Sequence, residues 1–180
     1  MILTKQDMNR YIRQDMRMNG VDPDGLGGVV LWLKCHVNPR LLFIRNLRHY
    51  EYYYNQKQNV WNRFWKLWFY VIHKHLSYKL GYTIYANNFG AGLYLGHYGT
   101  IVVNPEVRIG ENCTIHVCVN IGMGASVIGD NVYISPGVKI VKPVHIGNNV
   151  TIGANAVVNR DFPDNCVVAG IPAKIIKMKE

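Results

Sequence analysis

The sequence predicts a mainly β protein in which a parallel β-helix follows an α-helical N-terminal part. Three observations support this fold class: a fixed six-residue period in the second half, small residues at regular places within that period, and helical spacing in the first half. The chain has 180 residues, enough for one compact domain with an appended subdomain. We expect an α-helical N-terminal subdomain over residues 1–80 and a β-helix domain with a C-terminal tail over residues 81–180.

Aliphatic residues of the second half recur every six positions. One column contains Ile128, Ile134, Ile140, Ile146, Ile152 and Val158, and a second follows four residues later with Val132, Val138, Val144, Val150, Ala156 and Phe162. An earlier block has Val103, Ile109, Ile115 and Ile121, with Val107, Cys113, Val119 and Ala125 as companions. A fixed hexapeptide period is typical of a parallel β-helix, in which stacked coils form continuous apolar columns. Each fully buried aliphatic side chain contributes roughly 1.5–3 kcal/mol.

Corners and breaks complete the pattern. Glycine and the asparagines suit tight corners that need positive φ, and the asparagines are Asn112, Asn131, Asn148 and Asn149. The period breaks twice, because Ile101 to Ile109 is a step of eight residues and Ile121 to Ile128 is a step of seven. Loops that leave a solenoid often line its functional face.

The first half has helical character. Thr4 is a plausible N-cap of a helix that ends near Asn19 and Gly20. Apolar segments at 26–37 and 40–54 are separated by Pro39, and a last helix over 59–80 ends at Gly81. Residues 50–70 are rich in aromatic side chains with Lys and Arg among them. These aromatic residues either pack the helices together or contact sugar rings or a membrane surface.

Charge and cysteine content limit the class of protein. The net charge of +9 lies mostly in residues 1–80, which have 13 Lys/Arg against 5 Asp/Glu, whereas residues 81–180 have 7 against 6. Such an excess suits nucleic acid, an anionic membrane surface or an anionic substrate. No apolar run reaches the ~18 residues of a membrane span, and the N-terminus does not resemble a secretory signal. The four cysteines show no metal-ligand spacing, so we expect a cytoplasmic protein with reduced cysteines and no bound metal.

One segment, residues 92–100, carries the candidate chemistry. His97 comes two positions after the inward-facing Leu95, so its ring should point outward, and glycines on both sides would let a substrate approach. Imidazole exchanges protons near neutral pH, which suits a general base. His116 follows the inward-facing Ile115 and is a second candidate. The alternative for both is a surface or packing histidine.

Four motifs identify a resemblance. They are G-L-Y-L-G-H-Y-G-T-I-V-V-N-P at 92–105, I-G-E-N-C-T-I at 109–115, I-G-N-N-V-T-I-G-A-N-A-V-V at 146–158, and V-V-A-G-I-P-A-K at 167–174. Residues 80–177 resemble the serine acetyltransferase-like family of hexapeptide-repeat acyltransferases. The resemblance implies left-handed winding and a homotrimer or pair of trimers with a cleft between neighbouring coils. It also implies that His97 deprotonates an acceptor hydroxyl, which attacks acetyl-CoA directly. No His or Cys grouping in the sequence suggests a metal, and we expect no nucleic-acid partner.

The resemblance also suggests which residues surround the reaction. It places an acceptor cleft at Tyr82, Gly96, Tyr98 and His116. It places coenzyme contacts at Gly122, Met123, Pro136, Gly137, Gly153, Ala154, Lys174 and Lys177.

Three departures from true serine acetyltransferases weaken the case for serine as acceptor. The family has an acidic residue directly before the catalytic histidine, where this chain has Gly96. The long glycine-rich loop with an Arg-His pair is missing after Ile121, and no aspartate is found to orient His97. A site without a paired group for serine should lose specificity for it. The pattern better resembles the capsular, colanic or exopolysaccharide branch, whose acceptor is a sugar hydroxyl. The basic, aromatic residues of the N-terminal half would suit a peripheral position at the inner membrane face. Serine acetylation and a non-catalytic β-helix binding protein are the alternatives.

Overall fold

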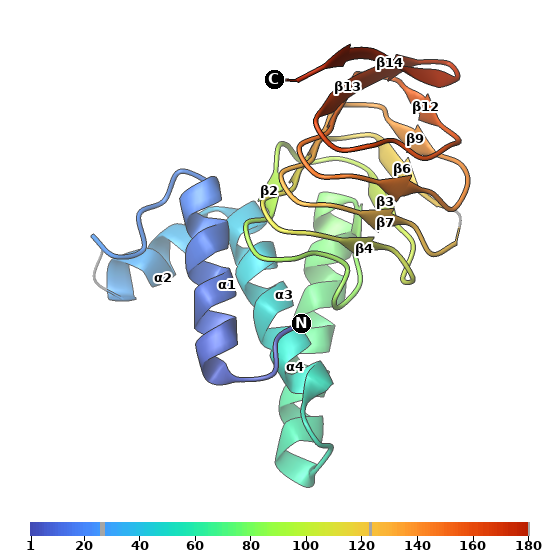
Figure 1. Ribbon diagram of the computed structural model, residues 1–180. Coiled ribbons are helices and arrows are strands. Elements are labelled where there is room, and N and C mark those ends of the chain that lie inside the picture. The colour runs from blue at the N-terminus through green and yellow to red at the C-terminus, as the bar shows by residue number, and fades with distance from the viewer. Residues whose placement is uncertain (26–27, 123, 180) are drawn as a thin grey trace.

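The computed structural model contains a group of helices at one end of a β-helix, with the C-terminus at the opposite end (Figure 1). It describes residues 1–25, 28–122 and 124–179. The described helices are α1 (Lys5–Met18), α2 (Gly28–Val37), α3 (Pro39–Asn55) and α4 (Val60–Leu80). The predicted fold class, a left-handed parallel β-helix preceded by an α-helical part, is confirmed.

Local sequence signals set the helix ends. The Thr4 side chain accepts a hydrogen bond from the backbone of Asp7 in a capping box at the start of α1. Helix α3 begins at Pro39, where a missing N–H costs nothing. Asn59 caps α4, and Gly81 ends it with φ of 79°, a conformation that glycine adopts without strain. The helix boundaries expected from the sequence are therefore confirmed to within about two residues.

Three walls of short parallel strands form the β-helix. The first wall contains β1 (Tyr82–Thr83), β3 (Ile101–Val103), β6 (Val119–Ile121), β9 (Lys139–Ile140) and β12 (Val157–Val158). The second contains β4 (Arg108–Ile109), β7 (Val127–Ile128) and β10 (His145–Ile146). The third contains β2 (Tyr94–Leu95), β5 (Thr114–Ile115), β8 (Tyr133–Ile134), β11 (Thr151–Ile152), β13 (Cys166–Gly170) and β14 (Ala173–Met178).

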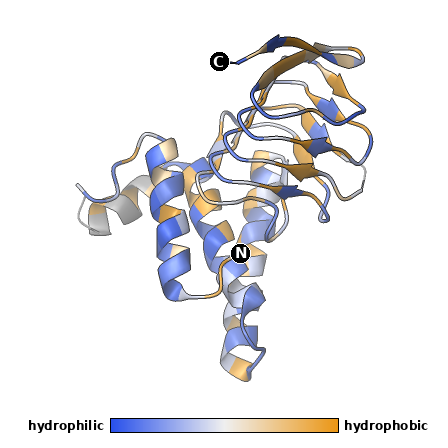
Figure 2. Ribbon diagram, in the orientation of Figure 1, coloured by the Kyte–Doolittle hydropathy of each residue, from blue (hydrophilic) through white to orange (hydrophobic). Residues whose placement is uncertain are grey.

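The predicted apolar columns fill the interior of this prism. All residues of the 128–158 column and its companion column are buried, and Figure 2 shows hydrophobic residues recurring from coil to coil among hydrophilic ones. Asn112, Asn131 and Asn149 occupy corners with φ of 56–57°. One expectation was wrong: Ala125 is exposed, and Ser126 takes the inward position. The cause is the seven-residue step before Ile128, which shifts the register by one, and the Ser126 hydroxyl accepts a hydrogen bond from the Val144 amide at 3.2 Å.

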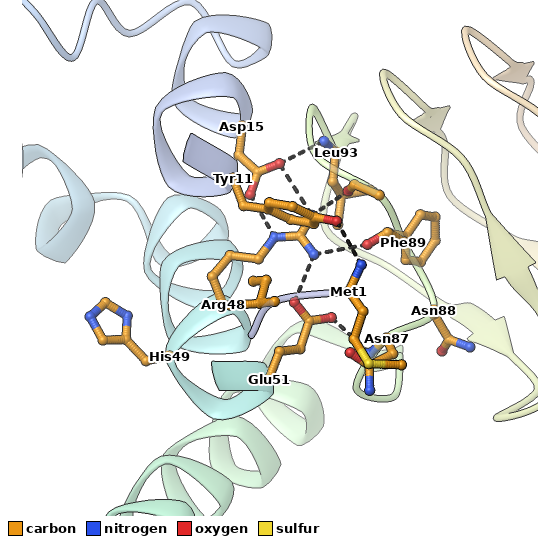
Figure 3. Close-up of polar contacts among 12 residues, drawn as sticks. Met1, Tyr11, Asp15, Arg48, His49, Glu51, Asn87, Asn88, Phe89 and Leu93 are labelled. Carbon is orange, nitrogen blue, oxygen red and sulfur yellow. Dashed lines mark hydrogen bonds and ion pairs between the residues drawn. The ribbon is translucent and has the colours of Figure 1, made fainter. Parts of the chain in front are cut away.

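A buried ion cluster joins the helices to the β-helix (Figure 3). The Arg48 guanidinium of α3 donates to Asp15 of α1 at 2.7 Å and to Glu51 at 2.8 Å, and all three side chains are buried. Arg48 also donates to the carbonyl oxygens of Phe89 and Gly90 in the first coil. Burial opposes the charge of Arg48, but Asp15 and Glu51 outweigh it and hold its pKa above the usual range. Arg48 thus links α1, α3 and the first coil through one side chain.

The far end of the β-helix is covered by the C-terminal segment. Strand β14 pairs antiparallel with β13, whereas the other strand pairs in this wall are parallel. In the part of the chain that the structure describes, no helix is long and apolar enough to cross a membrane.

Candidate active site

His97 lies on an enlarged corner between the third and first walls. Five residues separate Leu95 from Ile101 in this coil, whereas three separate their partners Ile115 and Val119 in the next. The eight-residue step therefore falls between Leu95 and Val103, not between Ile101 and Ile109 as the sequence spacing suggested. Ile101 belongs to the companion column. The two extra residues push the corner outward, which leaves His97 exposed.

Hydrogen bonds hold the backbone of this corner. The Tyr82 hydroxyl donates to the carbonyl oxygen of His97 at 2.9 Å, and the Gly99 amide donates to the carbonyl oxygen of Leu80 at 3.1 Å. Burial raises the pKa of Tyr82 to about 12, so its hydroxyl remains a donor. Arg40 of α3 donates to the carbonyl oxygens of Leu95 and Gly96. The His97 ring is free to meet a substrate while its backbone is fixed.

His116 lies beside His97 on the corner of the next coil. The two ring centroids are 6.4 Å apart, and the ring of Tyr133 lies 5.1 Å from that of His116. The Nε2 atom of His116 is buried and has no hydrogen-bond partner among the described residues. Burial, and secondarily the neighbouring His97, lowers the pKa of His116. A neutral imidazole with an unpaired nitrogen therefore lies beside the candidate base.

Gly96 leaves the space that His116 fills. A Cβ atom added at Gly96 would lie 2.5 Å from the Nδ1 atom of His116, which is closer than real Cβ contacts. A larger side chain at position 96 would require the His116 ring to move. The absence of an acidic residue before His97 is thus linked to the presence of His116 on the next coil.

Tyr98 completes the predicted acceptor cleft. Its ring is exposed, and the Arg40 guanidinium lies 5.8 Å from the ring centroid. Tyr82, Gly96, Tyr98 and His116 are therefore all brought to the His97 corner. Sequence reasoning missed Arg40 and Tyr133, because Arg40 comes from a distant helix and Tyr133 from an outward strand position that any residue can occupy.

A cavity of about 290 Å³ adjoins the same corner. It lies between the end of α4 and β1, and Tyr82 and Thr100 form the side nearest His97. The rest of its lining combines one cation, aromatic rings and hydroxyls, and includes Lys74, Ser77, Tyr78 and Tyr85.

The predicted coenzyme residues fall in three places. Pro136, Gly137, Gly153 and Ala154 lie on the corners between the third and first walls, stacked beyond the His97 corner. Gly122 lies on a different corner, between β6 and β7, and Met123 lies outside the described residues. Lys174 and Lys177 are exposed on β14 at the far end. Residues 1–25, 28–122 and 124–179 contain no group of three His, Cys, Asp or Glu side chains placed to hold a metal.

Comparison with protein families gives one match. Residues 125–160 match the family model described as bacterial transferase hexapeptide (six repeats). A serine acetyltransferase of Synechococcus elongatus is 34% identical over 94 residues, covering 48% of this chain and 38% of that protein. One from Staphylococcus xylosus is 38% identical over 95 residues, covering 49% and 44%. The matched segment is thus less than half of these relatives' own length.

Solved structures share the fold over a longer span. The serine acetyltransferase of Brucella abortus strain S19 has a TM-score of 0.73 at 24% identity, and the match covers 98% of this chain and 71% of that chain. A serine acetyltransferase in complex with coenzyme A has a TM-score of 0.72 at 22% identity, covering 96% and 71%. The Neisseria gonorrhoeae enzyme in complex with serine has a TM-score of 0.69 at 22% identity, covering 96% and 70%.

Proposed function

We propose that this protein is an acetyl-CoA-dependent O-acetyltransferase in which His97 is the general base. The observation that carries the proposal is the enlarged corner, which exposes one imidazole on a backbone fixed by Tyr82, Arg40 and Leu80. A fixed backbone with an open ring is what a positioned base requires.

The reaction is a direct acyl transfer. The His97 imidazole takes the proton of the acceptor hydroxyl, and the oxygen attacks the thioester carbonyl. The C–S bond then breaks, coenzyme A leaves as a thiolate that takes up a proton, and the acetyl group remains as an ester. The neutral His116 beside His97 supplies a second polar group to the acceptor or to the thioester oxygen.

Acetyl-CoA as donor is supported by the relative that was solved with coenzyme A. The stacked corners at Pro136–Gly137 and Gly153–Ala154 run from His97 toward the far end of the β-helix. Glycine there lets a ligand chain approach the backbone closely. Lys174 and Lys177 are candidates for its phosphates.

Serine is the acceptor that the comparisons favour. The relatives and structures compared above are serine acetyltransferases, and one was solved with serine bound. None of them supports the polysaccharide branch that the sequence motifs suggested.

A sugar hydroxyl remains the second candidate acceptor on one specific observation. His116 occupies the space that an acidic side chain at position 96 would need, so a group that would pair with the serine ammonium is not provided there. The adjoining cavity, with its rings and hydroxyls, is large enough for a monosaccharide.

We also propose that the protein acts in the cytoplasm as a homotrimer or pair of trimers, with residues 1–80 and 81–180 as its two structural parts. An exposed His97 on one β-helix edge is completed most simply by a neighbouring copy that closes the cleft.

Coenzyme A release, followed with a thiol reagent on serine and on a panel of sugars, tests the proposal. We expect turnover with at least one hydroxyl acceptor and a fall of about 10²–10⁴-fold in kcat for His97→Ala. Robust turnover with serine would exclude the sugar candidate, and the reverse result would exclude serine. Full activity of His97→Ala would overturn the assignment of the base.

A further inference from the structure

Helix α4 has two apolar sides. Its inner side packs on α3 and β1 through His73, Leu76 and Leu80, which are buried. Its outer side carries a stripe of exposed residues at helical spacing, which we call the α4 stripe: Trp61 (74% exposed), Phe64 (52%), Leu67 (61%), Trp68 (54%) and Val71 (57%). Spacings of three and four residues place these side chains on one face.

The five exposed apolar side chains of this stripe adjoin one another, whereas the exposed apolar residues of an ordinary surface are scattered. Scattered single residues need no explanation, but a contiguous apolar patch indicates an interaction site. Trp65, by contrast, is 6.2 Å from the ring of Tyr53, so part of the aromatic segment packs the helices together as the alternative interpretation expected. The first turns of α4 lie at the end farthest from the β-helix (Figure 1).

The charge around the stripe has one sign. From residue 52 to residue 105 the sequence contains no Asp or Glu, and it contains five cationic residues, Lys57, Arg63, Lys66, Lys74 and Lys79. A helix with Trp, Phe and Leu on one face and flanking Lys and Arg is suited to the interface of an anionic bilayer. Two copies of this chain meeting through the stripe would bring the cations of both copies that flank it, Arg63 and Lys66 among them, toward one another with no carboxylate between residues 52 and 105 to offset them, which is unfavourable.

We propose that the α4 stripe docks on an anionic membrane surface. Trp61, Phe64 and Trp68 enter the headgroup region, and Lys57, Arg63 and Lys66 contact the lipid phosphates. The helix lies on the surface and does not cross the bilayer, in accord with the absence of a membrane-spanning helix from the described residues. The proposal is independent of the acetyl-transfer reaction.

Vesicle co-sedimentation of the full chain tests it. We expect binding to phosphatidylcholine vesicles that contain about a third phosphatidylglycerol, and at least tenfold weaker binding to pure phosphatidylcholine or at high salt. The variant Trp61→Ser/Phe64→Ser/Trp68→Ser should lose at least tenfold in binding to the anionic vesicles. A matched control, Val37→Ser/Ile176→Ser, removes two residues that are 82% and 67% exposed on α2 and β14 and should bind like the unaltered chain.

Circular dichroism and light scattering separate the other outcomes. Equal binding by the triple variant and the unaltered chain would overturn the proposal. Failure of the unaltered chain to bind anionic vesicles would also overturn it. A smaller oligomer of the triple variant would then identify a second copy of the chain as the occupant of the stripe. If the triple variant unfolds, Arg63→Gln/Lys66→Gln replaces it, and unchanged binding of that folded variant to anionic vesicles would contradict the proposed charge contacts.

Discussion

At the scale of single residues, Tyr82 shows how a buried side chain can serve an exposed one. Its hydroxyl is the donor that fixes the His97 carbonyl oxygen. Tyr82→Phe removes this hydrogen bond, and we expect about 1 kcal/mol lower stability and a several-fold lower kcat for the proposed reaction. Urea unfolding and steady-state kinetics measure the two effects. Tyr54→Phe, at a half-exposed position on α3, is the control and should change neither.

Gly96 gives a second test at this scale. Gly96→Ala places a methyl group against the His116 ring, and overpacking of this kind costs about 1–3 kcal/mol. Because His116 is the obstacle, Gly96→Ala should cost much less stability in the His116→Ala variant than in the unaltered chain. Denaturant midpoints of the four proteins form the cycle. Additive effects would show that position 96 does not press on His116.

The sequence predicted the individual residues unevenly. His97 was found because its flanking glycines and its place beside Leu95 are local signals, and its exposure is confirmed. The step of eight was misplaced because Ile101 and Val103 are both aliphatic, so spacing alone fits either register. Arg40 was missed because its contacts with Leu95 and Gly96 join segments more than fifty residues apart.

At the scale of elements, helix α4 makes stability depend on pH through His73. Its Nε2 atom contacts the carbonyl oxygen of Ile84 at 2.8 Å, and burial lowers the pKa of His73. Below the ordinary histidine pKa of 6.5 the unfolded chain binds a proton that the folded chain does not. Stability contributed by the neutral ring is therefore present above this pH and lost as the pH falls.

The variant His73→Phe checks that sign. It should be less stable at pH 7.5, because the contact with Ile84 is lost, but its unfolding free energy should fall less between pH 7.5 and 5.5 than that of the unaltered chain. Urea titrations at both pH values give the comparison. An equal fall in the two proteins would mean that other groups, such as the half-buried His49, whose pKa burial also lowers, carry the whole dependence.

The elements themselves were the best-predicted level. The six-residue period reflects the inward-facing residues of successive strands, and the period of three to four reflects the buried face of each helix. Both repeat along the chain and are therefore visible in the sequence. The exposed α4 stripe could not be located in advance, because Trp65 and Trp68 are the same residue type in one helix. Both are exposed, and only the folded structure shows that Trp65 also packs against Tyr53 of α3.

At the scale of the whole molecule, the Arg48 cluster is a buried polar link between the helices and the β-helix. Arg48→Met would leave Asp15 and Glu51 buried without their cation, and breaking such a cluster costs roughly 3–5 kcal/mol. This is a large part of a typical stability of about 5–15 kcal/mol. Thermal unfolding measures it. Arg10→Met removes an exposed pair with Glu111 and a contact over the Tyr11 ring, and it should cost at most about 1 kcal/mol. Equal losses in both variants would contradict the special role of Arg48.

The sequence did not reveal this cluster because Asp15 lies 33 residues before Arg48 and the carbonyl groups of Phe89 and Gly90 lie 41 and 42 residues after it, and each charged residue is ordinary for a helix surface. Asp15 also accepts from the Gly92 and Leu93 amides, so the cluster extends into the first coil. The backbone at the start of the segment that carries His97 is therefore fixed by a side chain of α1, 77 residues earlier in the sequence.

The antiparallel pairing of β14 with β13 affects whether the molecule can assemble into fibres. The last rung of a parallel solenoid presents an unpaired backbone edge, which is a template for strands of other molecules. Here the chain's own tail occupies that edge along β13. Lys174 and Lys177 then place charge along the new outer strand, which discourages another molecule from stacking there. End-to-end polymerisation through this wall would first have to peel β14 away.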